Sequence, residues 1–284
     1  MAETIYRSGE LLDLLTEKFQ AHNMEEASAE ARAIMAELLD CSRLQAKLER
    51  SRIIEPALYK QALQILQRRL NDEPWQYIFR RAYFRDLTLK VDPSVLIPRP
   101  ETELLVEWCI KNLPPHGSLL DVGTGSGAIA LSVATERSDA EVTASDISTE
   151  ALATAMENAR NCAPDKIKFV VSDLFSNLAG EKFDIIAANL PYVTEEEYKT
   201  LSPEVRNFEP KLALTSGDDG LDLIRKIIDR APEFLTPRGA MILEMSSPQT
   251  SVAAELMQKS LNWCAIEIIR DYTQRDRFAA ARLR

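Results

Sequence analysis

The chain has 284 residues, of which 45% are hydrophobic and 27% are charged, so a disordered chain is excluded and two domains fit the length better than one. The formal net charge is −10. Because non-specific nucleic-acid binding depends on clustered lysine and arginine, this charge argues against a large phosphate-binding face.

The N-terminal part of the chain carries a helical pattern of apolar residues. Leu11, Leu15 and Phe19 recur at the spacing of one helix face, and Ser8 precedes them as the expected N-cap. Similar apolar stripes follow farther along this region. We therefore predict a small helical bundle over residues 1–80, followed by a linker with a hairpin over residues 81–103.

The rest of the chain, residues 104–284, alternates between short apolar segments and helical patterns. This alternation predicts an α/β domain with a mostly parallel sheet and helices on both of its faces. The last two strands are joined without a helix, which predicts a terminal antiparallel hairpin. The expected strands are residues 118–122, 141–145, 167–171, 183–188, 239–245, 265–270 and 278–283, and the expected helices are residues 127–135, 149–161 and 221–234.

A glycine-rich turn follows the first of these strands. Gly123, Gly125 and Gly127 form the pattern G-x-G-x-G, which lets the backbone approach a ligand closely. A dinucleotide fingerprint would have its third glycine where Ala128 stands. A nicotinamide-dependent dehydrogenase is therefore disfavoured.

Acidic residues end the next two strands. Asp146 stands where a carboxylate can accept hydrogen bonds from both hydroxyls of an unphosphorylated ribose. Asp173 can accept a hydrogen bond from an exocyclic amine, and Leu174 can contact an adenine ring. Together with the glycine turn, these residues indicate S-adenosylmethionine as the ligand.

The tetrapeptide Asn189-Leu190-Pro191-Tyr192 follows the strand expected at residues 183–188, at the edge where open α/β sheets bind ligands. An amide or aromatic-amine nitrogen is a poor nucleophile because its lone pair is delocalised. The Asn189 side-chain oxygen and the Leu190 carbonyl can each accept one N–H of such a group, and Tyr192 offers a flat face for stacking. An ordinary strand-to-loop turn is the alternative, but the glycine turn upstream favours methyl transfer to nitrogen.

Several motifs resemble those of the HemK/PrmC family of protein glutamine N5-methyltransferases. The most specific is Leu-Ile-Pro-Arg-Pro-Glu-Thr-Glu at residues 96–103, which is similar to the signature between that family's helical and methyltransferase domains. The glycine turn and the tetrapeptide at residues 189–192 also match. Further matches are residues 208–210 with 213–214, residues 217–221, and residues 270–272 with 276–277. Members of the family methylate the glutamine of the Gly-Gly-Gln motif in class I peptide chain release factors.

The resemblance implies a Rossmann-like, seven-stranded class I S-adenosylmethionine-dependent methyltransferase domain at residues 104–284, with residues 1–80 recognising the release factor. It implies that Asn189 and the Leu190 carbonyl hold the glutamine amide, while Pro191 and Tyr192 shape the slot. The implied cofactor-binding residues are Gly123, Thr124, Gly125, Ser126, Gly127, Asp146, Asp173, Leu174 and Asn189. A class I release factor is the expected partner, without a membrane or a nucleic-acid substrate.

The chain departs from the family pattern at three points. Leu190 replaces the first proline of the usual Asn-Pro-Pro-Tyr, although its carbonyl is unaffected. Residues 243–249 lack the usual glycine after a strand, and Gln274 stands where the family often has glycine. We expect the latter two departures to lie away from the reacting centre.

Two related activities remain as alternatives. An adenine-N6 methyltransferase acting on DNA or RNA uses the same chemistry, since the exocyclic adenine amine is also conjugated. Such an enzyme must flip the target base out of the stack and bind the phosphate backbone. A methyltransferase acting on a ribosomal protein glutamine has a different sequence after its Pro-Arg. The negative net charge and the Arg-Pro-Glu-Thr-Glu segment favour the release factor as substrate.

The cysteine and histidine content argues against a disulfide-bonded or metal-binding protein. The four cysteines are widely spread without a C-x-x-C pair, and the chain has only two histidines. Neither a disulfide framework nor a zinc site is expected. The first residues lack the features of a signal peptide, and no apolar run approaches membrane-spanning length, so we expect a cytoplasmic protein.

Overall fold

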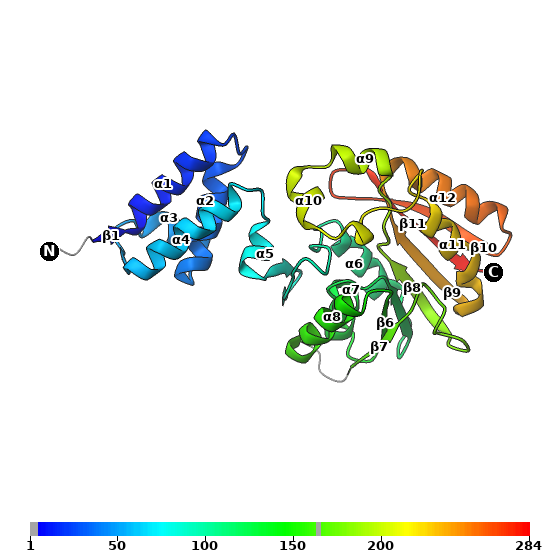
Figure 1. Ribbon diagram of the computed structural model, residues 1–284. Coiled ribbons are helices and arrows are strands. Elements are labelled where there is room, and N and C mark those ends of the chain that lie inside the picture. Colours follow the sequence, from blue (N-terminus) through cyan, green and yellow to red (C-terminus); the bar gives the residue numbers. More distant parts are fainter. Residues whose placement is uncertain (1–4, 163–165) are drawn as a thin grey trace. The chain divides into compact units, whose positions relative to one another are not determined.

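The computed structural model describes residues 5–162 and 166–284. The chain divides into two compact units, Met1–Phe79 and Arg80–Arg284 (Figure 1). Residues 81–103, expected to link two domains, therefore belong to the second unit. The elements of the first unit are β1 (Tyr6–Arg7), α1 (Ser8–Ala21), α2 (Ala27–Leu39), α3 (Arg43–Leu48), β2 (Ile53–Ile54), α4 (Pro56–Arg69) and α5 (Trp75–Phe79).

The first unit is a helical bundle with its own apolar core. Leu11, Leu15 and Phe19 of α1 are buried and share one cluster with apolar residues of α2 and α4. Ser8 was expected to cap α1, but it is the first helical residue and Arg7 is the N-cap. The Ser8 hydroxyl donates instead to the Glu49 carbonyl, which ties the start of α1 to the end of α3.

The second unit contains a seven-stranded sheet in the order β10-β11-β9-β8-β5-β6-β7. Strand β5 is parallel to β6 and β8, whereas β11 is antiparallel to both β9 and β10. The predicted fold class, with its terminal antiparallel hairpin, is confirmed. The strands are β5 (Ser118–Val122), β6 (Glu141–Asp146), β7 (Ile167–Val171), β8 (Phe183–Ala188), β9 (Leu235–Glu244), β10 (Trp263–Arg270) and β11 (Asp276–Leu283).

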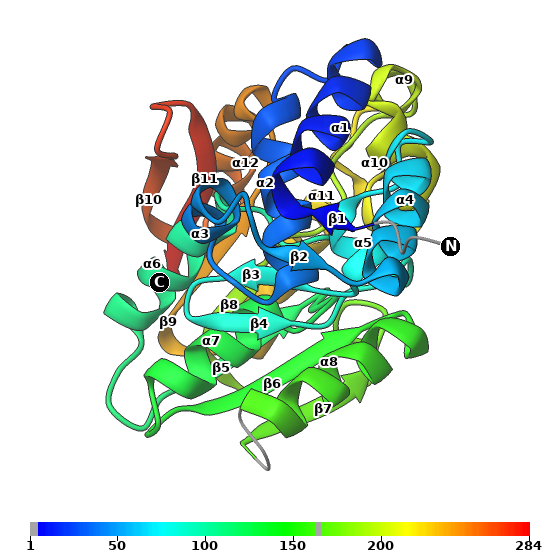
Figure 2. The ribbon, with the colours of Figure 1, turned by 90° about the vertical axis from the view of Figure 1, so that its left-hand side faces the viewer.

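Helices cover both faces of this sheet. The helices are α6 (Thr102–Asn112), α7 (Ala128–Glu136), α8 (Thr149–Cys162), α9 (Glu195–Thr200), α10 (Pro203–Phe208), α11 (Asp222–Arg230) and α12 (Ser247–Lys259), with short 3-10 turns at Lys211–Ala213 and Ala231–Phe234. Side chains alternate along each strand, so Leu119 and Ile185 pack in one cluster with α6 and α7, and Leu120 and Ile186 pack in another with α11 and α12. In Figure 2, α7 and α8 lie in front of the sheet.

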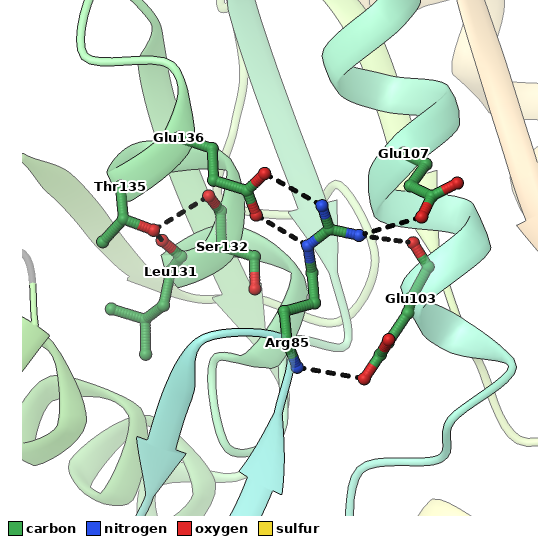
Figure 3. A network of polar contacts seen from close by, with 7 residues as sticks. All are labelled: Arg85, Glu103, Glu107, Leu131, Ser132, Thr135 and Glu136. Carbon is green, nitrogen blue, oxygen red and sulfur yellow. Dashed lines mark hydrogen bonds and ion pairs between the residues drawn. The ribbon is translucent and has the colours of Figure 1, made fainter.

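A two-stranded hairpin, β3 (Ala82–Phe84) and β4 (Leu87–Leu89), precedes α6. Arg85 lies in its turn, and its guanidinium makes bonds of 2.6 and 2.9 Å to the Glu136 carboxylate on α7 (Figure 3). The Arg85 backbone N–H donates to the Glu103 carboxylate at 3.0 Å. The hairpin is thus bound to the end of α7 and to the first turn of α6, which begins at Thr102.

Within the described ranges, no helix is long and apolar enough to cross a membrane.

Candidate active site

A cavity of about 430 Å³ lies in the second unit beyond the carboxyl ends of the parallel strands. Residues 123–126 follow β5, and Asp146 ends β6. Asp173 and Leu174 follow β7 and also line the cavity. The chain leaves β5 for β6 on one side and returns to β8 on the other, so the cavity occupies the switch point of the sheet, where such folds bind ligands.

The glycine turn forms the floor of this cavity. Gly125 has φ of +55°, and a Cβ added to it would meet no atom of the chain within 4 Å, so the backbone there faces open space. Gly123 has φ of +73°, and its Cβ would lie 3.0 Å from the Leu190 side chain. Gly127, predicted to bind the cofactor, is outside the cavity lining and is the N-cap of α7. Backbone conformation and close approach therefore require glycine at Gly123 and Gly125.

Two carboxylates hold the turn in place. Oδ2 of Asp146 accepts the Gly125 backbone N–H at 2.9 Å, and burial raises the pKa of this carboxyl. Asp121, at the end of β5, accepts the Thr124 hydroxyl at 2.6 Å and the Ala130 backbone N–H at 3.2 Å. Complete burial raises the pKa of Asp121 to about 7. Asp121 is fully buried and lies outside the cavity lining, whereas Asp146 lines the cavity.

The predicted catalytic tetrapeptide begins directly after β8. Asn189, Leu190 and Pro191 line the cavity. Nδ2 of Asn189 donates to the Thr102 hydroxyl at 3.1 Å. Within the described residues, neither the Asn189 side-chain oxygen nor the Leu190 carbonyl has a hydrogen-bond partner. Two adjacent acceptors are therefore available at this wall.

Tyr192 does not belong to the cavity lining. Its side chain is partly buried against the apolar cluster of α11 and α12, and burial raises its pKa to about 12. Its carbonyl accepts the Gln249 side-chain N–H at 2.9 Å. Gln249 belongs to the departing segment that we expected to lie away from the reacting centre. No residue of that segment lines the cavity, but Gln249 contacts the backbone of the tetrapeptide. The stacking role of Tyr192 stays a prediction.

The wall formed by residues 94–102 was not among the site residues predicted from the sequence. Leu96, Pro98, Arg99 and Thr102 line the cavity. The buried Glu209 carboxylate fixes this segment, since it accepts from Arg99 at 2.7 Å and from the Ile97 backbone N–H at 3.1 Å. The signature at residues 96–103 was the available signal, but we had interpreted it as part of a linker.

Among residues 5–162 and 166–284, no group of three or more histidine, cysteine, aspartate or glutamate side chains is arranged to hold a metal ion.

Two family models match the chain, the PrmC N-terminal domain at residues 10–79 and the methyltransferase small domain at residues 100–204. Curated proteins named release factor glutamine methyltransferase match almost the whole chain. The protein from Nitratidesulfovibrio vulgaris is 37% identical over 96% of this chain and 94% of its own length. The protein from Chlorobaculum tepidum is 33% identical over 97% of both chains.

Solved structures of methyltransferases share the fold. A methyltransferase from Pyrococcus furiosus has a TM-score of 0.53 and 18% identity, covering 70% of this chain and 89% of its own. A 16S rRNA methyltransferase from Thermus thermophilus, solved with AdoMet and guanosine, has a TM-score of 0.51 and 19% identity, covering 72% of this chain and 50% of its own. At these identities the likeness shows a shared fold alone.

Proposed function

Because this chain belongs to the family of release factor glutamine methyltransferases, we propose that it methylates the N5 side-chain amide nitrogen of the glutamine in the Gly-Gly-Gln motif of class I peptide chain release factors. The observation that carries this proposal is the pair of unpartnered acceptors at Asn189 and Leu190 within the described residues. Two N–H groups on one nitrogen match two adjacent acceptors. A primary amide fulfils this requirement.

The cavity fits S-adenosylmethionine as the methyl donor. Its volume lies in the usual range for a small-molecule site. The open space above Gly125 admits a ligand against the backbone, and the Asp146 carboxylate is available to ribose hydroxyls. Asp173 and Leu174 would hold the adenine, with Ile147 on the same wall. When bound, S-adenosylmethionine supplies a methyl group attached to a positively charged sulfur.

The chain's own residues orient the nitrogen. Asn189 Oδ1 and the Leu190 carbonyl accept the two N–H groups, which turns the nitrogen lone pair out of conjugation and toward the open part of the cavity. These acceptors also stabilise the positive charge that develops on the nitrogen. The surplus proton leaves after that charge has formed, so no strong general base is required at this site.

The first unit would supply affinity for the protein substrate. A Gly-Gly-Gln loop alone offers little contact area, and stable protein interfaces bury far more. Leu44 and Leu48 of α3 are 64% and 68% exposed, and Ile53 of β2 is 66% exposed. The core of this unit is complete without these side chains, so they are available to a folded partner.

The first prediction concerns the cofactor. Replacing Asp146 with alanine removes a charged acceptor for the ribose, so Asp146→Ala weakens S-adenosylmethionine binding by about 1–3 kcal/mol in calorimetry. Asp229→Ala, an exposed change on α11, serves as the control and leaves the affinity unchanged. Equal affinities for wild type and Asp146→Ala would remove this carboxylate from the cofactor site.

The second prediction separates chemistry from binding. Asn189→Ala deletes one preorganised acceptor and lowers kcat about 10²- to 10³-fold on release factor, with a smaller change in cofactor affinity. Asn112→Ala, at the end of α6, is the matched control for loss of an asparagine side chain. Near wild-type turnover in Asn189→Ala would mean that the substrate nitrogen is held elsewhere.

The third prediction assigns a role to the first unit. A chain shortened to residues 80–284 keeps the whole cavity and binds S-adenosylmethionine, which also verifies that it folds. Its KM for intact release factor rises at least about tenfold, because the area that binds the partner is lost. A short Gly-Gly-Gln peptide is an equally poor substrate for both proteins. Unchanged efficiency on intact release factor would contradict the recognition role.

A further inference from the structure

We propose that Thr102 and Glu244 are positioning residues, which fix the end of the Asn189 side-chain amide that faces the substrate. The proposal rests on the function proposed above. It adds two residues that do not hold the substrate amide themselves and that act through Asn189.

A directed chain of hydrogen bonds joins the three side chains. The Thr102 hydroxyl donates its single hydrogen to Oε2 of Glu244 at 2.8 Å. It can therefore only accept from Asn189, and Nδ2 of Asn189 donates to it at 3.1 Å. The amide NH2 is consequently held against Thr102, and the amide oxygen is directed away from it, where a substrate N–H needs an acceptor.

The three residues come from elements that are rigidly joined. Asn189 follows β8 and Glu244 ends β9, and these strands are paired in parallel next to both residues. Thr102 begins α6, and the neighbouring Glu103 is bonded to Arg85 of the hairpin (Figure 3). Thr102 is 4% exposed and Glu244 is 1% exposed. Water therefore has little access to the hydrogen bond between Thr102 and Glu244.

The charge of Glu244 determines which group donates and which accepts in this series of hydrogen bonds. A protonated Glu244 can donate to Thr102, which frees the threonine hydrogen for the Asn189 oxygen and lets the amide reverse. The amide NH2 would then meet the NH2 of the substrate, two donors without an acceptor. The network therefore favours catalysis only when Glu244 is ionised.

The surroundings make this ionisation sensitive to pH near neutrality. Burial raises the pKa of Glu244 to about 7. Glu101 raises the pKa further, whereas the Thr102 hydrogen bond and the charges of Arg277 and Arg99 lower it. After burial, the charge of Glu244 is the next contribution that raises the pKa of Tyr192, so Tyr192 is a further titratable group near this carboxylate. Within the described part of the chain, Oε1 of Glu244 is buried without a hydrogen-bond partner. Activity should accordingly rise with pH as Glu244 loses its proton.

Substitutions at Thr102 test the positioning role by kinetics. Thr102→Val removes the hydroxyl at nearly constant volume and lowers kcat about 10- to 100-fold, with little change in KM for release factor. Thr102→Ser keeps the hydroxyl and restores most of the loss. Thr135→Val, which removes a hydroxyl bonded within α7, is the matched control and keeps wild-type kcat. Equal losses in Thr102→Val and Thr102→Ser would overturn the proposal.

A second measurement is independent of turnover. In ¹⁵N-labelled full-length protein, the side-chain amide signal of Asn189, assigned by its absence in Asn189→Asp, should shift with a midpoint near pH 7. In Glu244→Gln the Asn189 signal no longer shifts with pH. The rise of kcat with pH over the same range is also lost. An Asn189 signal that titrates identically in both proteins would refute the network. If wild-type protein leaves release factor unmethylated, the proposed function fails, and the amide signal still decides whether the network exists.

Discussion

The parallel strands of the second unit impose the constraint on which the site depends. Strands β5, β6, β7 and β8 run in one direction, so the segments that follow them emerge at one edge of the sheet. This arrangement brings the glycine turn, two acidic strand ends and Asn189 to one cavity, although they are far apart in the sequence. The arrangement of the site therefore follows from the direction of these strands.

Three carboxyl groups line this cavity or bond to residues that line it. Asp121, Asp146 and Glu244 are each largely or fully buried, and burial raises the pKa of all three. Buried negative charge is unfavourable by itself, and a cation brought next to it offsets part of that cost. A positively charged methyl donor and a nitrogen that becomes cationic both meet this condition under the proposed function.

The sequence predicted the sheet and part of the cavity lining because both depend on local patterns. Alternating apolar residues located the strands, and the glycines and Asp146 identified the ligand edge. Contacts between distant segments could not be predicted. Thr102 and Glu244 are 142 residues apart and meet only because α6 packs beside β9. The link between Gln249 and Tyr192 is hidden for the same reason, since no local pattern indicates which loop a side-chain amide will reach.

Mass spectrometry of an intact release factor tests the central claim most directly. The purified full-length protein is incubated with a class I release factor and S-adenosylmethionine carrying an isotopically labelled methyl group. The account predicts one added methyl group, located by fragmentation on the side-chain nitrogen of the glutamine in the Gly-Gly-Gln motif. Labelling at any other residue, or no labelling while the protein binds S-adenosylmethionine, would contradict it.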